Sequence, residues 1–229
     1  MFLFLFDIDG TILSVKKGIA RKIFQKTLSE LFDICIEDHH LPGFNGMTDL
    51  SIVGEIASNA GIPHISDYDE VWQNLFPKFR EQLTAETVQL LPGISQLIAS
   101  LDARHDCALG LVTGNFRENA FLKLDVHDLG SYFNFGAYGC DRANRNELPA
   151  IALQRAEQLY NQKFSPERTL VIGDTVKDVL CAKASGMKSV AVATGGENMD
   201  HIMSLEPDLM LDSFAEYNDS INMMINLVK

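Results

Sequence analysis

The sequence predicts an α/β protein: a doubly wound parallel sheet with a small α-helical domain inserted into it. Short, almost wholly apolar segments alternate with amphipathic helical segments over most of the chain, and one long stretch contains helical patterns alone. Apolar runs without polar alternation are typical of strands buried on both faces, as in a parallel sheet covered by helices. Their alternation with helices indicates right-handed βαβ crossovers.

The strands and helices of the predicted core follow in order along the chain. The apolar runs predict strands at Phe2–Ile8, Cys107–Val112, Thr169–Ile172, Ser189–Ala193 and Asp208–Leu211. Amphipathic segments between and after these runs predict helices at Gly93–Leu101, Arg117–Leu124, Leu148–Tyr160, Val176–Ser185 and Ala215–Leu227. The first run does not resemble a signal peptide, because no basic region precedes it and Asp7 makes its apolar part too short. A buried strand is the better interpretation.

The inserted domain is predicted between the first strand and the rest of the core. From about residue 15 to residue 85 no strand-like run occurs. Apolar side chains recur at helical spacing from Ile19 to Phe32, and further helical patterns cover 50–60 and 68–83. We therefore expect residues 15–85 to form the helical insert, and residues 1–14 and 86–229 to form the core, with Pro92 and Gly93 marking the return to it.

Composition narrows the classes of function. The 229 residues include 31 acidic and 19 basic side chains, a formal net charge of -12. This balance argues against nucleic-acid binding and against docking on an anionic membrane, because both need clustered Lys and Arg. The four cysteines form no CxxC pair, so we expect free thiols and a cytoplasmic location. No run approaches the roughly 18 apolar residues of a membrane-spanning helix, and both a monomer and a homodimer remain open.

The strongest chemical signal follows the first predicted strand. Asp7 and Asp9 lie two residues apart, directly before Gly10 and Thr11. Ligands bind at the carboxyl ends of parallel strands, where two carboxylates are costly to bury unless a cation neutralises them. Carboxylate oxygens suit Mg²⁺. Taken alone, the motif is also compatible with a solvated acidic turn.

Two further strands end in polar motifs. Thr113, Gly114 and Asn115 supply a hydroxyl, a flexible backbone and an amide at a helix start, where N–H groups favour an anion. Asp174 and Asp178 follow another apolar strand. Either motif alone could be a capped turn. Together with Asp7 and Asp9, they would place four acids and a threonine on strand ends that a parallel sheet brings side by side.

These three segments resemble the first, second and fourth motifs of the haloacid dehalogenase superfamily. Their order and spacing match, and the helical insert resembles the small α-helical cap of that superfamily. The chain is most similar to its phosphoglycolate phosphatase-type and related sugar-phosphate phosphatases. The resemblance implies a Rossmann-like core and hydrolysis of a small phosphorylated metabolite.

The resemblance also implies roles for individual acids. Asp7 would be the nucleophile that forms an aspartyl-phosphate, and Asp9 would protonate the leaving group and then activate water. The Asp7 carboxylate, the Asp9 backbone carbonyl and Asp174 would hold Mg²⁺, with Asp178 as a further ligand or a support for one. An acid at position 9 favours phosphoryl transfer over dehalogenation, because a leaving halide needs no proton.

Phosphate binding is the part of the resemblance that departs from the family pattern. Thr113 and the backbone N–H groups near Gly114 and Asn115 would hold the phosphoryl oxygens. The family normally has a Lys before the helix that precedes the fourth motif, but the corresponding stretch here contains none. Arg145 is the best substitute by position and Arg142 the next.

Two alternatives to a phosphatase remain open at this point. A sugar phosphomutase shares all of these motifs, and the missing Lys also fits a catalytically impaired metabolite-binding protein. Substrate choice is expected to rest with the insert. There, a polar, Gly-rich turn at residues 43–49 either faces the active site or is an ordinary helix connection.

Overall fold

The computed structural model describes residues 1–62, 65 and 67–229. Its main element is a six-stranded parallel sheet in the order β5-β4-β1-β6-β7-β8. These strands are β1 (Phe2–Phe6), β4 (Cys107–Val112), β5 (Gly136–Ala137), β6 (Thr169–Gly173), β7 (Lys188–Val192) and β8 (Leu209–Leu211). The order reverses beside β1, so β1 lies in the centre of the sheet although it comes first in the sequence.

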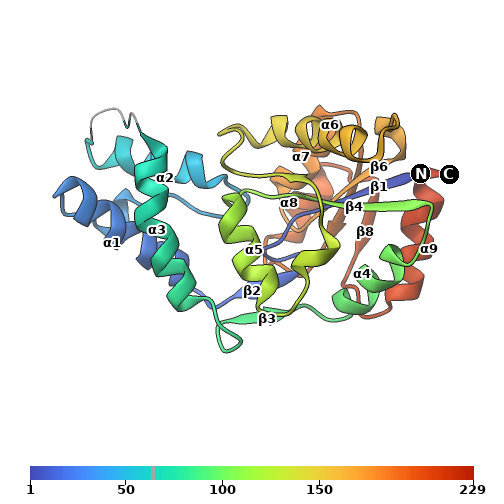
Figure 1. Cartoon of the computed structure of the whole chain (residues 1–229), viewed down its shortest axis with the longest axis horizontal. Helices are drawn as coiled ribbons and strands as arrows, with labels where there is room; N and C mark the ends of the chain where they lie inside the picture. The colour runs from blue at the N-terminus through green and yellow to red at the C-terminus, as the bar shows by residue number, and fades with distance from the viewer. Residues whose placement is uncertain (63–64, 66) are drawn as a thin grey trace.

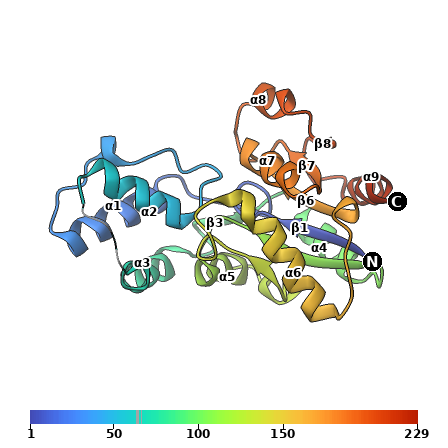
Figure 2. The same cartoon turned by 90° about the horizontal axis from the view of Figure 1, so that it is seen from above.

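Helices cover both faces of the sheet (Figures 1 and 2). The helix pair α6 (Leu148–Tyr160) and α7 (Val176–Ala184) packs on one face. The helices α4 (Ile94–Asp102), α5 (Arg117–Asp125) and α9 (Tyr217–Val228) pack on the other. A short helix, α8 (Met199–Ser204), packs on α7 through Ile202.

Alternation along β1 explains why its run is apolar throughout. Phe4 and Phe6 belong to the apolar cluster of the α4, α5 and α9 face, whereas Leu3 and Leu5 belong to that of α6 and α7. All four are completely buried. A strand covered on both faces needs apolar side chains at every position.

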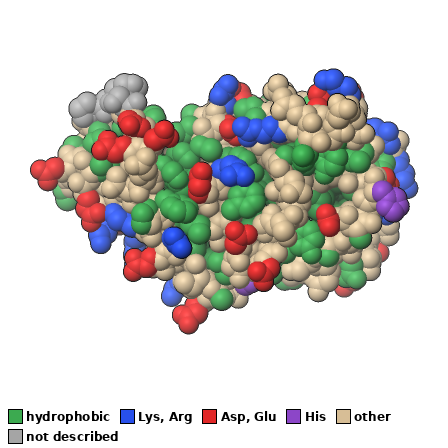
Figure 3. All heavy atoms as spheres, viewed as in Figure 1, with side chains coloured by type: hydrophobic (Ala, Val, Ile, Leu, Met, Phe, Trp, Pro, Cys, Tyr) green, Lys and Arg blue, Asp and Glu red, His purple; other side chains and the backbone are tan. Residues whose placement is uncertain are grey.

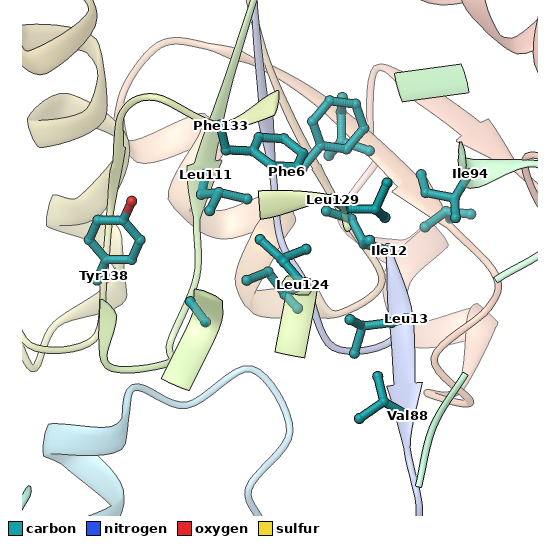
Figure 4. Packing of buried hydrophobic residues seen from close by; sticks show 14 of the residues in the cluster. Phe6, Ile12, Leu13, Val88, Ile94, Leu111, Leu124, Leu129, Phe133 and Tyr138 are labelled. Carbon is teal, nitrogen blue, oxygen red and sulfur yellow. The ribbon is translucent and has the colours of Figure 1, made fainter. Parts of the chain in front are cut away.

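The larger cluster continues from the sheet toward a small antiparallel ribbon (Figure 4). Phe6 packs edge-on against Phe133 with ring centroids 6.2 Å apart. Leu13 and Val88 extend the cluster to the ribbon, in which β2 (Leu13–Val15) pairs with β3 (Val88–Leu90). The ribbon thus joins the chain entering the insert to the chain leaving it.

The insert consists of α1 (Ile19–Phe32), α2 (Asp49–Asn59) and α3 (Tyr68–Gln82), which lie together at one end of the molecule (Figure 1). Phe24 of α1 packs on Phe79 of α3, with ring centroids 5.8 Å apart. Trp72 of α3 stacks on Phe116 of the core at 4.5 Å. The division into residues 15–85 and the remainder stays a prediction, and the β2–β3 ribbon lies at its two boundaries.

Several short elements were not predicted. These are β2, β3, β5, α8 and four 3₁₀ turns at Asp38–His40, Gly130–Tyr132, Arg145–Glu147 and Pro166–Arg168. Two or three residues carry too little periodicity to reveal a strand. The predicted first strand also ends earlier, at Phe6, because the chain turns at the acidic motif.

The surface carries charged side chains of both signs (Figure 3). On the face drawn in Figure 3, acidic side chains are spread among basic and apolar ones and form no single patch. In the described part of the chain, every helix is too short or too polar to cross a membrane.

Candidate active site

Three neighbouring strands, β4, β1 and β6, deliver the sequence motifs to one edge of the sheet. Directly after β1 the chain turns at Gly10, whose φ is +84°. A Cβ at this position would lie 2.3 Å from Oδ2 of Asp174. Two features of this turn therefore require glycine at position 10: the left-handed backbone and the close approach of the Asp174 carboxylate.

An acidic cluster lies at this edge. One carboxylate oxygen from each of Asp7, Asp174 and Asp178 falls within 4.8 Å of the other two, and all three residues are buried. The Thr11 hydroxyl donates to Asp174 at 3.1 Å, and the Thr175 hydroxyl donates to Asp178 at 2.7 Å. These hydrogen bonds fix the carboxylates around a shared centre. Three hard oxygen donors in one place suit a magnesium ion.

Burial changes the acidity of this cluster. Desolvation, reinforced by the neighbouring carboxylates, raises the pKa of Asp7 to about 6 and that of Asp174 to about 9. Arg145 opposes both shifts. In the absence of a cation the cluster therefore retains protons near neutral pH, and a divalent ion would replace them.

Arg145 is the cation of the acidic cluster. Its Nη2 lies 2.9 Å from an oxygen of Asp7 and 2.5 Å from one of Asp178, and its Nη1 donates to the Gly46 carbonyl at 3.3 Å. Burial alone would lower the pKa of Arg145, but the charges of Asp178 and Asp7 raise it well above its ordinary value. Arg142, the other candidate, is exposed and pairs with Glu147 at 3.2 Å. Of the two arginines, the structure therefore brings only Arg145 to the carboxylates.

The second motif forms the adjoining wall of the site. The buried Thr113 hydroxyl accepts hydrogen bonds from the Asn115 backbone N–H at 3.3 Å and from its side-chain amide at 2.9 Å. A Cβ at Gly114 would lie 1.9 Å from the Met47 carbonyl oxygen. This close approach explains the glycine, and it brings the 43–49 turn of the insert against the second motif.

Asp9 lies apart from the other three acids. Its carboxylate accepts hydrogen bonds from Lys123 Nζ, at 2.6 and 2.8 Å, and from the Asn115 amide at 2.7 Å. The expected meeting of four acids is thus a group of three, with the fourth side chain held by α5. Lys123 was not predicted from the sequence. The available signal was its spacing, because Asn119 and Lys123 share one face of α5 and Asn115 lies four residues before Asn119.

The 43–49 turn also supplies two side chains that contact the core. Asp49 donates its backbone N–H to the Gly114 carbonyl at 2.7 Å, and its carboxylate accepts the Phe116 N–H at 2.7 Å. The Thr48 hydroxyl donates to the Ala143 carbonyl at 2.8 Å. Burial raises the pKa of Asp49 to about 7.

A cavity of about 330 Å³ lies between this turn and the core. Its polar lining residues include Thr48, Ser51, Asn144, Arg145 and Lys177. Arg145 lines this cavity and also contacts Asp7, whereas Asp7, Asp174 and Asp178 themselves do not line it. A second hollow, of about 460 Å³, lies beside β5 and is lined by other residues.

Comparison with known families decides the classification. The family described as "Haloacid dehalogenase-like hydrolase" matches residues 4–192. The chain belongs to this family. It is accordingly an enzyme of the haloacid dehalogenase-like hydrolases, with the α/β core predicted from its sequence.

Relatives within the family include several phosphatases. The chain is 26% identical to a phosphoglycolate phosphatase of Salmonella typhi, covering 92% of this chain and 88% of the relative. It is 25% identical to a phosphoglycolate phosphatase of Vibrio vulnificus, covering 94% of each. Among solved structures it is similar to β-phosphoglucomutase from Clostridium difficile, with a TM-score of 0.72, 19% identity and coverage of 99% of this chain and 97% of the other. The last likeness concerns the fold alone.

Proposed function

We propose that this haloacid dehalogenase-like hydrolase is a Mg²⁺-dependent phosphatase that acts on a small phosphorylated metabolite, of the phosphoglycolate or sugar-phosphate type, through an aspartyl-phosphate. The observation that carries the proposal is the contact of Arg145 with Asp7, 2.9 Å apart, inside the buried cluster of Asp7, Asp174 and Asp178. The phosphatase relatives support the same reaction class.

The nucleophile in this proposal is the Asp7 carboxylate, which attacks phosphorus. Magnesium, held by Asp7, Asp174, the Asp9 backbone carbonyl and Asp178, would neutralise the charges that otherwise keep a carboxylate from a phosphate dianion. Arg145 orients Asp7 and adds a second positive charge beside it. The buried surroundings strengthen these electrostatic effects by excluding water.

Asp9 and the second motif complete the proposed reaction. Asp9 protonates the leaving oxygen, and its carboxylate then takes a proton from the water that hydrolyses the aspartyl-phosphate. The Thr113 hydroxyl and the N–H groups of Gly114 and Asn115 donate hydrogen bonds to the phosphoryl oxygens. The helical insert acts as a cap whose 43–49 turn contacts the substrate's leaving group. A reducing compartment such as the cytoplasm suits the enzyme, because all four cysteines are free thiols.

The test is phosphate release from p-nitrophenyl phosphate and from a panel of phosphorylated metabolites, with and without Mg²⁺. We expect Asp7→Asn to lower kcat by more than about a thousandfold, as expected for removal of a nucleophile, while thermal unfolding shows an intact fold. Unchanged turnover in this variant would contradict the proposal. Transfer of phosphate to a sugar phosphate instead of water would identify a mutase.

A further inference from the structure

We infer that Lys123 is a positioning residue that holds Asp9 in place for acid–base catalysis, separately from the cation that serves the nucleophile. This inference rests on the proposed phosphatase function. It concerns a residue that lies outside the three sequence motifs, on the inner face of α5.

The contacts of Lys123 use its full capacity for hydrogen bonding. An ammonium group has three N–H donors and no acceptor. Lys123 Nζ contacts three oxygens: the two carboxylate oxygens of Asp9, at 2.8 and 2.6 Å, and Oδ1 of Asn115 at 2.6 Å. Its side chain is 7% exposed, whereas that of Asp9 is 42% exposed. Lys123 therefore approaches Asp9 from inside the protein and leaves its outer side open to a substrate.

Burial of this lysine calls for an explanation. A buried ammonium is costly unless it is paired and hydrogen-bonded. Lysine rarely occupies such a position for packing alone, since an apolar side chain of similar length would avoid the cost. Here the partner is Asp9, a partly buried residue with a proposed catalytic role. The position is thus explained by what Lys123 does to Asp9.

Lys123 also determines which way the Asn115 amide points. Oδ1 of Asn115 accepts from Lys123 and, at 3.2 Å, from the Asn119 amide. This leaves the Asn115 amide N–H groups to face Asp9 at 2.7 Å and the Thr113 hydroxyl at 2.9 Å. A lysine facing Oδ1 thereby links the orientation of Asp9 to that of the phosphate-binding threonine.

The two buried cations have separate contacts. Among the described residues, the ion pairs of Arg145 are with Asp7 and Asp178, and the ion pair of Lys123 is with Asp9. Arg145 thus serves the carboxylates assigned to attack and metal binding. Lys123 serves the carboxylate assigned to proton transfer, so its removal should impair that step more than phosphate binding.

Substrates with different leaving groups distinguish this step. An alkyl phosphate leaves as a strongly basic alkoxide and needs the proton from Asp9, whereas p-nitrophenolate leaves without one. We therefore expect Lys123→Met to lower kcat/KM for an alkyl phosphate by about a hundredfold and to lower kcat/KM for p-nitrophenyl phosphate at least about tenfold less. The ratio kcat/KM is used because it reports the steps up to departure of the leaving group and excludes the later hydrolysis, in which Asp9 serves both substrates alike.

Matched variants separate positioning from folding. Arg117→Met removes a cation from the exposed side of the same helix and should leave both rates unchanged. Lys123→Arg keeps the charge and should recover part of the alkyl phosphate activity. In an Asp9→Asn background, Lys123→Met should lower kcat/KM for the alkyl phosphate by less than about a further threefold. A residue that acts through the Asp9 carboxylate has no effect once that carboxylate is removed. This double variant also removes both charges of the ion pair together, which keeps the comparison possible if Lys123→Met alone is unstable.

Each outcome decides between the two proposals. Equal losses on both substrates, or full additivity with Asp9→Asn, would overturn the positioning role while leaving the phosphatase intact. A wild-type protein that releases no phosphate from any substrate with Mg²⁺ would overturn the proposed function, and the role of Lys123 with it.

Discussion

At the scale of single residues, the site depends on how a guanidinium differs from an ammonium. Nη2 of Arg145 contacts the carboxylate of Asp7 after β1 and that of Asp178 in the first turn of α7, and Nη1 reaches the Gly46 carbonyl of the insert. A planar group with donors in fixed directions can make these contacts together, whereas a lysine offers one compact charge on a flexible stem. Arg145 therefore connects the proposed nucleophile, the proposed metal-binding carboxylates and the insert.

Substitution of Arg145 should separate these contributions. We expect Arg145→Lys to lower kcat by about 10- to 100-fold and Arg145→Ala by more, with the alanine variant also destabilised by about 3–5 kcal/mol because buried carboxylates lose their partner. Phosphate-release kinetics and urea unfolding measure the two effects. Equal rates for wild type and both variants would show that Arg145 has no part in catalysis.

Metal binding should release protons. Asp174, with a pKa raised to about 9, is protonated at pH 7 in the metal-free protein, and a ligand must lose its proton to bind Mg²⁺. Apparent Mg²⁺ affinity should therefore increase from pH 6 to pH 9. Calorimetry at pH 7 in two buffers of different ionisation enthalpy should detect release of up to about one proton per ion. The interpretation fails if the binding enthalpy is the same in both buffers.

The individual acids could be located from the sequence, but their partners could not. Asp7 and Asp174 directly follow apolar strands that pair in parallel, and Asp178 joins them from the first turn of the helix after β6. The pairing of Asp9 with Lys123 depends instead on the orientation of α5 and on one side-chain direction. Likewise, Arg145 and Arg142 both lie in one short stretch, and only the 3₁₀ turn at Arg145–Glu147 separates a buried guanidinium from an exposed one.

At the scale of elements, the start of α2 is the principal contact between insert and site. Asp49 is the first residue of this helix, yet its carboxylate accepts a backbone N–H from the core at Phe116. Two hydrogen bonds from this one residue therefore connect α2 to the loop after β4. The helix start thus fixes where the 43–49 turn lies.

Asp49 should make stability depend on pH. Its pKa in the folded protein is raised from 3.8 to about 7. Below pH 4 its ionisation therefore does not affect the free energy of unfolding, and between pH 4 and pH 7 its ionisation lowers that free energy progressively. At 1.36 kcal/mol per pKa unit, the free energy of unfolding of wild type should fall relative to Asp49→Asn by up to ~4 kcal/mol over this range. Urea unfolding of both proteins from pH 4 to pH 8 measures the difference. The exposed helix-capping variant Asp67→Asn, measured over the same pH range, serves as the control.

Long elements were predictable, whereas most of the short ones, β8 excepted, were not. Helices of nine residues or more complete at least two turns, so their apolar spacing is visible in the sequence. The paired segments β2 and β3 have three residues each, and β5 has two. Pairing of β2 with β3, which fixes where the insert joins the core, is a tertiary contact between residues more than 70 positions apart in the chain.

At the scale of the whole molecule, the three buried acids should link metal binding to stability. A ligand that binds only the folded state at a hundred times its Kd adds about 2.7 kcal/mol. For a chain of this length, saturating Mg²⁺ should therefore raise Tm by roughly 5–10 °C. Asp174→Asn should lose this increase, which differential scanning calorimetry with Mg²⁺ or with a chelator can measure. An equal rise in both proteins would place the ion elsewhere.

The β2–β3 ribbon has a consequence for how such an enzyme can change. The chain enters the insert along β2 and leaves it along β3, and these strands are hydrogen-bonded to each other. The two ends of the insert therefore lie side by side. Segments with adjacent ends can be lengthened or replaced with little effect on the chain that carries them. The proposed catalytic acids, which follow β1 and β6, lie outside the exchanged segment, and so does Lys123. Selection could therefore alter what the enzyme accepts without altering the chemistry it performs.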